Sequence, residues 1–125
     1  PGSYATGNQF EVPNVPRQLV ALNQGLSNLT FTGNTINGDA GIQYLVAIES
    51  NGATISGNTF DGASTAGAVR ARGADISFTG NTVQGDGVGT GFQLLNATGT
   101  NSISDNTVED FAIGIHNSGS NGTQI

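Results

Sequence analysis

Residues 53–60 have the sequence Ala-Thr-Ile-Ser-Gly-Asn-Thr-Phe, which combines a short polar–apolar alternation with a Gly-Asn corner. Alternation with a period of two residues is typical of a β-strand. The Gly-Asn-Thr tripeptide and its variants recur at residues 7–9, 33–35, 57–59, 80–82 and 105–107. Their asparagines, which are spaced by 26, 24, 23 and 25 residues, are Asn8, Asn34, Asn58, Asn81 and Asn106. Repeats of this length indicate a solenoid, in which each coil buries its apolar face against its neighbours.

Each repeat contains three short segments with the alternation of a strand. One segment precedes the asparagine and a second follows it, as in residues 53–56 and 59–60. The third segments are residues 20–23, 46–49, 69–72, 92–95 and 113–116. In this third set we expect the first and third residues to point inward, so that Ile113 and Ile115 stack on Phe92 and Leu94. The sequence therefore predicts an all-β, single-domain parallel solenoid over residues 1–125, with about five coils of 23–26 residues and no helix.

The pattern Ile-Ser-Gly-Asn-Thr-Phe at residues 55–60, followed by a Gly-containing turn and a short apolar strand, resembles a known repeat. It is similar to the right-handed parallel β-helix repeats of pectate lyases, alginate lyases, mannuronan epimerases and phage tailspikes. The resemblance extends from about Gly7 to Ile125. It implies a right-handed parallel β-helix, and it leaves the activity open because one fold serves many functions.

The composition excludes several classes of function. The chain has three Arg, no Lys and nine acidic residues, so its net charge of -6 argues against binding to nucleic acid. It has no Cys, which excludes disulfides and thiolate metal sites, and no segment is apolar enough to span a membrane. A chain without Met is expected to be processed or excised from a longer protein, and its acidic, Thr/Asn/Gly-rich composition favours a secreted, extracellular or cell-surface location.

The asparagine column is interpreted as structural. Stacked amides at one corner of the solenoid can satisfy one another and the turn backbone, so we expect a hydrogen-bonded ladder rather than a ligand site.

The outer side of the third segments is chemically richer and gives a candidate binding surface. Glu49 and Arg72 lie on adjacent coils and can pair, and Arg70 lies two residues before Arg72. The resemblance implies that enzymes acting on acidic polysaccharides use such a face, with a cation for the uronate carboxylate and a base for the sugar proton. The weak candidates for carbohydrate binding are Arg70, Arg72, Glu49, Gln93, His116 and Tyr44.

No catalytic residue is assigned, although an enzymatic role stays open. A lyase pair of Lys and Arg is impossible without Lys, and the Asp-Pro-His-Glu stretch of the epimerases is absent. No cofactor or metal is expected, because the turn carboxylates Asp39, Asp61, Asp86 and Asp110 form no six-oxygen cage for calcium.

Two further columns of Ser and Thr form a predicted hydroxyl face. They are Thr30, Thr54, Ser77 and Ser102, and Thr32, Ser56, Thr79 and Ser104. A Thr-x-Thr array on a β-helix suggests an ice-binding or adhesive surface, but hydroxyl and β-branched residues also suit any exposed strand.

The two ends of the chain carry no polar capping helix, and open parallel edges invite pairing with another chain. The segment at residues 121–125 resembles residues 51–55, and residues 5–10 resemble the part of the coil that follows. The candidate assembly residues are Ala5, Thr6, Gly7, Phe10, Gly122, Thr123, Gln124 and Ile125. The leading hypothesis is a structural module that stacks head to tail with copies of itself into a filament or surface assembly. The alternatives are a fragment of a polysaccharide lyase or epimerase that binds acidic polysaccharide, and an ice-binding or adhesive module.

Overall fold

The computed structural model describes residues 4–6, 9–12, 20–38, 44–62 and 67–125. These residues form short parallel strands and no helix, and none of them forms a helix with the length and hydropathy of a membrane span. The strands are β1 (Tyr4–Thr6), β2 (Gln9–Val12), β3 (Val20–Ser27), β4 (Thr30–Thr32), β5 (Thr35–Gly38), β6 (Tyr44–Asn51), β7 (Thr54–Ser56), β8 (Thr59–Gly62), β9 (Gly67–Arg72), β10 (Ser77–Thr79), β11 (Thr82–Gln84), β12 (Thr90–Leu95), β13 (Asn101–Ser104), β14 (Thr107–Glu109), β15 (Ile113–Ser118) and β16 (Thr123–Gln124).

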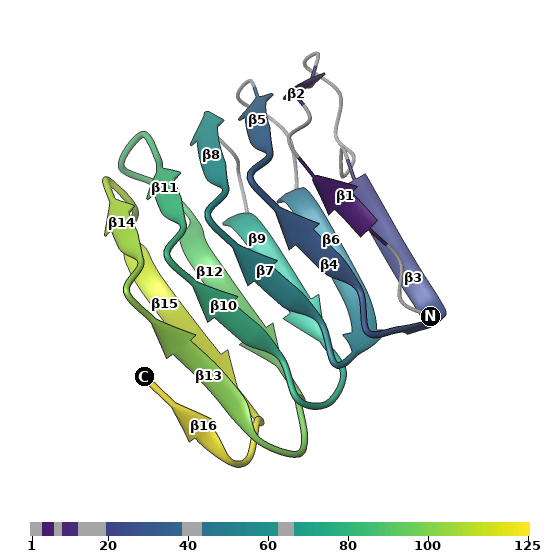
Figure 1. Ribbon diagram of the computed structural model, residues 1–125. Coiled ribbons are helices and arrows are strands. Elements are labelled where there is room, and N and C mark those ends of the chain that lie inside the picture. The colour runs from purple at the N-terminus through teal and green to yellow at the C-terminus, as the bar shows by residue number, and fades with distance from the viewer. Residues whose placement is uncertain (1–3, 7–8, 13–19, 39–43, 63–66) are drawn as a thin grey trace.

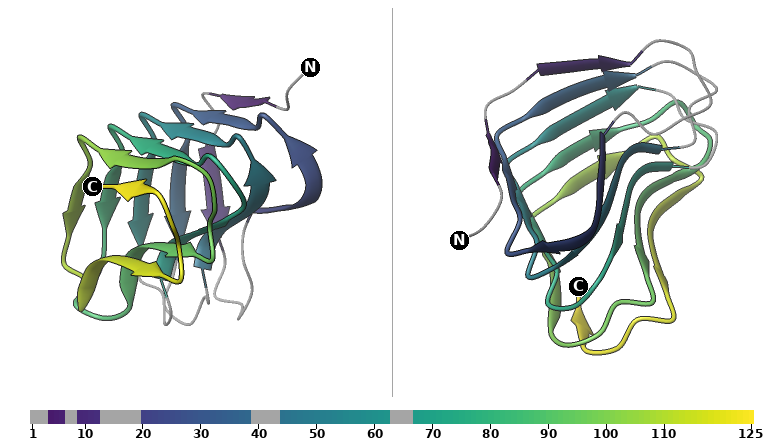
Figure 2. Two further views of the ribbon diagram at one scale, coloured as in Figure 1. Left: turned by 90° about the horizontal axis from the view of Figure 1, so that it is seen from below. Right: turned by 90° about the vertical axis from the view of Figure 1, so that its right-hand side faces the viewer.

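The strands form three parallel sheets that wrap around one core (Figure 1). Sheet A has the order β1-β4-β7-β10-β13-β16, sheet B has the order β14-β11-β8-β5-β2, and sheet C has the order β15-β12-β9-β6-β3. Each coil contributes one strand to each sheet in turn, which gives the three-sided outline seen in Figure 2. The predicted all-β, right-handed parallel β-helix is thereby confirmed.

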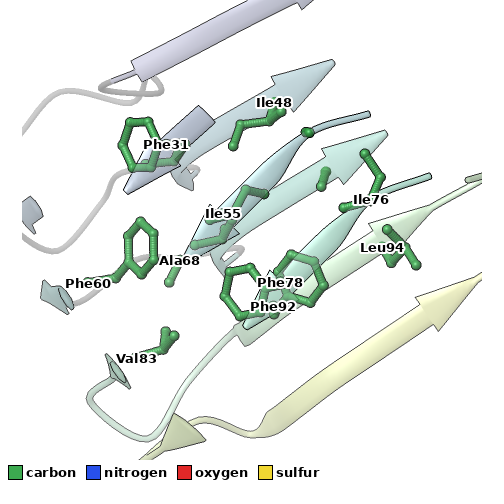
Figure 3. Close-up of a cluster of buried hydrophobic side chains, with 14 of the residues drawn as sticks. Phe31, Ile48, Ile55, Phe60, Ala68, Ile76, Phe78, Val83, Phe92 and Leu94 are labelled. Atoms are coloured by element: carbon green, nitrogen blue, oxygen red, sulfur yellow. The ribbon is translucent and has the colours of Figure 1, made fainter. Parts of the chain in front are cut away.

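The core consists of apolar columns that run along the solenoid. In sheet A, Phe31 pairs with Ile55, which pairs with Phe78, and all three side chains are fully buried. In sheet B the corresponding column contains Ile36, Phe60, Val83 and Val108. Rings from the different sheets stack inside the coil (Figure 3), with centroids 6.3 Å apart for Phe31–Phe60 and 3.9 Å apart for Phe78–Phe92. Such columns explain why the chain alternates with period two in each short segment.

Sheet C contains a bend that the alternation alone does not predict. Leu45 and Val46 are consecutive and both belong to the buried core, as are Ala68 and Val69 on the next coil. Each of these strands therefore bends between the two consecutive residues. A residue just before the bend, such as Tyr44, faces outward.

In the third set of segments, the predicted register of the last one, residues 113–116, is wrong by two residues. Ile115, not Ile113, pairs with Phe92, and His116 pairs with Gln93. Ile113 instead pairs with Thr90 on the outer side of the bend and is 48% exposed. A shift by two residues keeps the in–out alternation intact, so the hydrophobic pattern does not reveal it.

Positive backbone φ angles recur at two corners of the coil. Gly33, Gly57, Gly80 and Asp105, which precede the repeated asparagines, have φ angles between 56° and 66°. A second column contains Asn28, Gly52, Asp75, Gly99 and Gly122. Glycine favours this left-handed conformation, and Asn and Asp tolerate it better than other residues, which explains the residue types at both corners.

Candidate functional site

The outer face of sheet C brings together four of the predicted site residues. The ring of Tyr44 lies under Arg70, with the guanidinium carbon 4.9 Å from the ring centroid. The hydroxyl of Tyr44 donates a hydrogen bond of 2.8 Å to Oε1 of Gln93. The amide Nε2 of Gln93 in turn lies 3.4 Å from Nδ1 of His116. These side chains therefore form one connected polar group that spans four coils.

The register explains this grouping. Ala47, Arg70, Gln93 and His116 occupy one row across strands β6, β9, β12 and β15. Neighbouring strands of a sheet are about 4.8 Å apart, so the row presents one polar group per coil from Arg70 onward. The predicted stacking of Ile115 on Leu94 would place His116 beside Leu95, whereas the observed register places it beside Gln93.

Gly67 is a part of this face that the sequence analysis missed. A Cβ atom at Gly67 would lie 2.9 Å from Cε1 of Tyr44 and 2.6 Å from the carbonyl oxygen of Thr90. The missing side chain therefore leaves the space into which the Tyr44 ring folds, and this ring is only 9% exposed. Gly67 begins β9 and pairs with Tyr44, which begins the neighbouring strand β6 of sheet C.

Arg72 and Glu49 lie in the next row of the same face. Their nearest charged atoms are 4.0 Å apart, and both side chains are partly exposed. An exposed ion pair of this kind contributes little to stability, but it offsets the positive charge of Arg72.

Charge is segregated around the solenoid. Arg70, Arg72 and His116 are the only basic residues in the described part of the chain, and all three lie on sheet C, where Glu49 is the one described acidic residue. Asp61 and Glu109 lie on strands of sheet B, and the residues Asp75, Asp86, Asp105 and Asp110 lie between strands. Within the described part of the chain, the outer face of sheet C is therefore the side best suited to an anion.

The asparagine column forms a hydrogen-bonded ladder at the corner between sheets A and B. Oδ1 of Asn58 accepts from both the backbone N–H and Nδ2 of Asn34, and Asn81 does the same for Asn58. Asn106 repeats the arrangement for Asn81. Asn34, Asn58 and Asn81 are 1% exposed, so the ladder offers little surface to a ligand. Asn8 lies outside the described residues.

The Ser and Thr columns lie on the outer side of sheet A. Hydroxyls bond to each other across coils, as in Thr32 and Ser56 at 3.2 Å, and within a strand, as in Ser77 and Thr79 at 3.3 Å. These contacts occupy part of the hydrogen-bonding capacity of the face.

The predicted assembly segments lie at the two edges of one sheet and share one row. Thr6 and its neighbours form β1, and Thr123 and Gln124 form β16, at opposite edges of sheet A. The pairing places Tyr4 and Gln124 in the same row. Gln124 thus stands in the row of Thr54, and β1 stands in the rows of Thr54–Ser56, so the two segments overlap at this one row. Of the other predicted residues, Ala5 lies in β1, Phe10 in β2 and Gly122 in the turn before β16, and Gly7 lies outside the described residues.

Apolar side chains near β14, β15 and β16 are less buried than the rest of the core. Ile125 is 76% exposed, and Val108, Phe111 and Ile115 are only partly buried against the core. The hydroxyl of Thr123 is buried and has no hydrogen-bond partner. At this edge of the described structure, these apolar side chains are incompletely covered and the Thr123 hydroxyl has no hydrogen-bond partner.

A family described as "Periplasmic copper-binding protein (NosD)" matches residues 4–125. No curated protein and no solved structure matches the chain.

Proposed function

Since the chain belongs to the NosD family of parallel β-helix repeat proteins, we propose that it is a β-solenoid module of the cell envelope that binds acidic polysaccharide. The surface proposed for this is the outer face of sheet C. The observation that carries the proposal is the charge segregation, which gathers Arg70, Arg72 and His116 on one face of an otherwise acidic molecule.

The shape of this face suits an extended polymer. It is built from parallel strands in register, so similar groups repeat along the solenoid axis at about 4.8 Å. An elongated ligand lying along the axis can meet Arg70, Gln93 and His116 in succession. Guanidinium groups bind carboxylates through paired N–H donors, and amide and imidazole groups can bond sugar hydroxyls.

Binding of the full chain to polygalacturonate and alginate, measured by isothermal titration calorimetry at low salt, tests the proposal. We expect saturable binding that weakens as salt is added, because exposed charge pairs are screened. The matched control ligand is the same polymer with its carboxyl groups reduced to alcohols, which should bind much more weakly. Absence of binding to both polyuronates at low salt would overturn the proposal.

Copper binding, which the description of the family names, does not follow for this chain from its residues. Copper is held in proteins mainly by imidazole, thiolate and thioether groups. The sequence has one His, no Cys and no Met. The described residues contain no group of three or more His, Cys, Asp or Glu that could hold a metal ion. The donor set therefore does not fit copper.

We propose end-to-end stacking as a second function, supported by the row that β1 and β16 share and by groups around β14–β16 that are incompletely covered in the described structure. Val108 and Ile115 are partly buried there, and the buried hydroxyl of Thr123 lacks a partner. A further coil supplied by another copy would cover these groups. The row that β1 and β16 share suggests how: β16 of one copy takes the place of β1 against β4 of the next, so that β2 and β3 of the second copy can pair with β14 and β15 of the first.

Particle size, measured by light scattering, tests this arrangement. Removal of residues 1–6 should promote assembly, since it frees the edge of β4, whereas Thr123→Pro should block it by disrupting β16. The control is Ser104→Ala, a substitution on the outer face that leaves both edges unchanged. If none of these changes alters the particle size, stacking is wrong, and the binding proposal for sheet C is unaffected.

A further inference from the structure

The two arginines on the outer face of sheet C are not equivalent. Arg72 lies 4.0 Å from Glu49, so its charge is partly offset within the protein. In the part of the chain that the structure describes, no ion pair involves Arg70. Arg70 therefore keeps its charge available to an external anion.

Arg70 is also held in one orientation. Its guanidinium rests on the Tyr44 ring, with 4.9 Å between the guanidinium carbon and the ring centroid. A guanidinium stacked on an aromatic ring keeps the N–H donors at its edge available, because stacking uses its flat face. Held in this way, the side chain loses less conformational entropy when a ligand binds than a mobile arginine would.

The Tyr44 ring is itself fixed on two sides. Gly67 leaves the space against which the ring packs, and the phenol donates a 2.8 Å hydrogen bond to Oε1 of Gln93. The other end of the Gln93 amide lies 3.4 Å from Nδ1 of His116. A chain of contacts over four coils thus holds a single guanidinium in place.

From this geometry we infer that Arg70 is the carboxylate-binding residue of the face, that Tyr44 and Gln93 position it, and that Arg72 does not bind the ligand directly. The group recognised is the planar carboxylate of a uronic acid, which matches the paired N–H donors of a guanidinium. The inference rests on the proposed binding of acidic polysaccharide, to which it adds the residue and the ligand group.

Two single variants of the full chain compare the arginines. Arg70→Ala should weaken binding to polygalacturonate at least about tenfold, the loss expected for one hydrogen-bonded contact with a charged group. Arg72→Ala removes the same formal charge from the same face and should change the affinity by less than about twofold, a surface-charge effect that added salt suppresses. Thermal unfolding of both variants checks that the solenoid is intact. Equal losses for the two variants would overturn the inference.

Further variants test the positioning of Arg70. Tyr44→Phe keeps the ring and removes the bond to Gln93, so it should weaken binding less than Tyr44→Leu, which removes the stacking surface. Arg70→Lys restores the charge without the planar donors and should recover only part of the affinity. Full recovery with Lys would show that charge alone is recognised and would overturn the assignment of a planar carboxylate contact.

The choice of ligand separates the two proposals. A sulfated polymer that carries no carboxylates should bind more weakly than polygalacturonate and should be less sensitive to Arg70→Ala. Binding of polyuronate that is insensitive to both arginine variants would sink the assignment to Arg70 while leaving the proposed function in place. Absence of any polyuronate binding by the unmodified chain would remove both.

Discussion

At the corner between sheets A and B, the repeated asparagines use both ends of their side-chain amides in hydrogen bonds. The amide of Asn81 accepts from the backbone and side chain of Asn58 through Oδ1, and it donates through Nδ2 to the carbonyl oxygen of Ile55 and to Asn106. Both halves of the amide are therefore needed, one as an acceptor and the other as a donor.

Replacement of this amide by a carboxylate tests the ladder. Asn81→Asp keeps the shape and the acceptor but loses the donors, which leaves an oxygen facing the Ile55 carbonyl and the Asn106 amide oxygen in a buried site. We expect a loss of roughly 2–4 kcal/mol in the free energy of unfolding, measured by urea denaturation. Asn117→Asp, an exposed control of the same chemistry, should change it by less than about 0.5 kcal/mol. Similar effects from both changes would contradict a structural role for the ladder.

The glycine before each asparagine is required by backbone geometry rather than by space. Gly57 has a φ angle of 61°, and a Cβ atom added there would meet nothing within 4 Å. Gly57→Ala should therefore lower the free energy of unfolding by about 1 kcal/mol through backbone strain alone. Gly57→Asp should cost less, since Asp105 occupies the equivalent corner with a φ angle of 56°. Chemical denaturation measures both, and an alanine variant as stable as the parent would refute the argument.

At the scale of one strand, β7 has a buried side and an exposed side. Ile55 is fully buried between Phe31 and Phe78, whereas its neighbour Thr54 is exposed. Ile55→Asp should unfold the chain, because it buries a charge without a partner at a cost above about 4 kcal/mol. Thr54→Asp should leave the circular dichroism spectrum and the melting temperature nearly unchanged. Comparable damage from the two substitutions would mean that the orientation of the strand is wrong.

The fold could be predicted from the sequence because the apolar alternation that indicates each strand also indicates how the strand pairs with its copy in the next coil. In the short strands of sheets A and B, an inward position such as Ile55 pairs with an inward position one coil later, so the alternation and the repeat indicate the same register. The turn before β15 lacks this support. Its length differs from that of the turn before β12, and a slip of two residues preserves the alternation, so Ile113 was placed inside when it lies outside.

The candidate site was predictable only as a set of residues on one face. Alternation places Arg70 and Gln93 outside, but it says nothing about where a long side chain extends. Tyr44 crosses over a whole strand to reach Gln93, and it can do so only because Gly67 leaves room. Such contacts depend on the bend in sheet C, which brings consecutive apolar residues inward and has no signature in a period of two.

For the whole molecule, the number of metal-binding side chains predicts the response to copper. We expect titration with Cu(I) to give no saturable binding in calorimetry, since the chain has neither Cys nor Met. Cu(II) should show only weak binding that His116→Ala abolishes, because a single imidazole is a poor site. A tight, stoichiometric site that survives this substitution would contradict the expectation.

The direction of the hydrogen bonds between coils has a mechanical consequence. Bonds such as that from the Thr54 N–H to the Leu29 carbonyl link one coil to the next, and the two ends of the chain lie at opposite ends of the solenoid (Figure 1). Tension applied to the termini therefore pulls along these bonds and loads the outermost coil first, rather than shearing all coils at once. Each coil contacts only its neighbours, so the chain should yield one coil at a time. A coil of 23–26 residues releases about 80 Å of extended chain, and force spectroscopy should record steps of this length. The solenoid would then act as a tether that lengthens under load and gives way gradually, instead of a rod that fails in a single event.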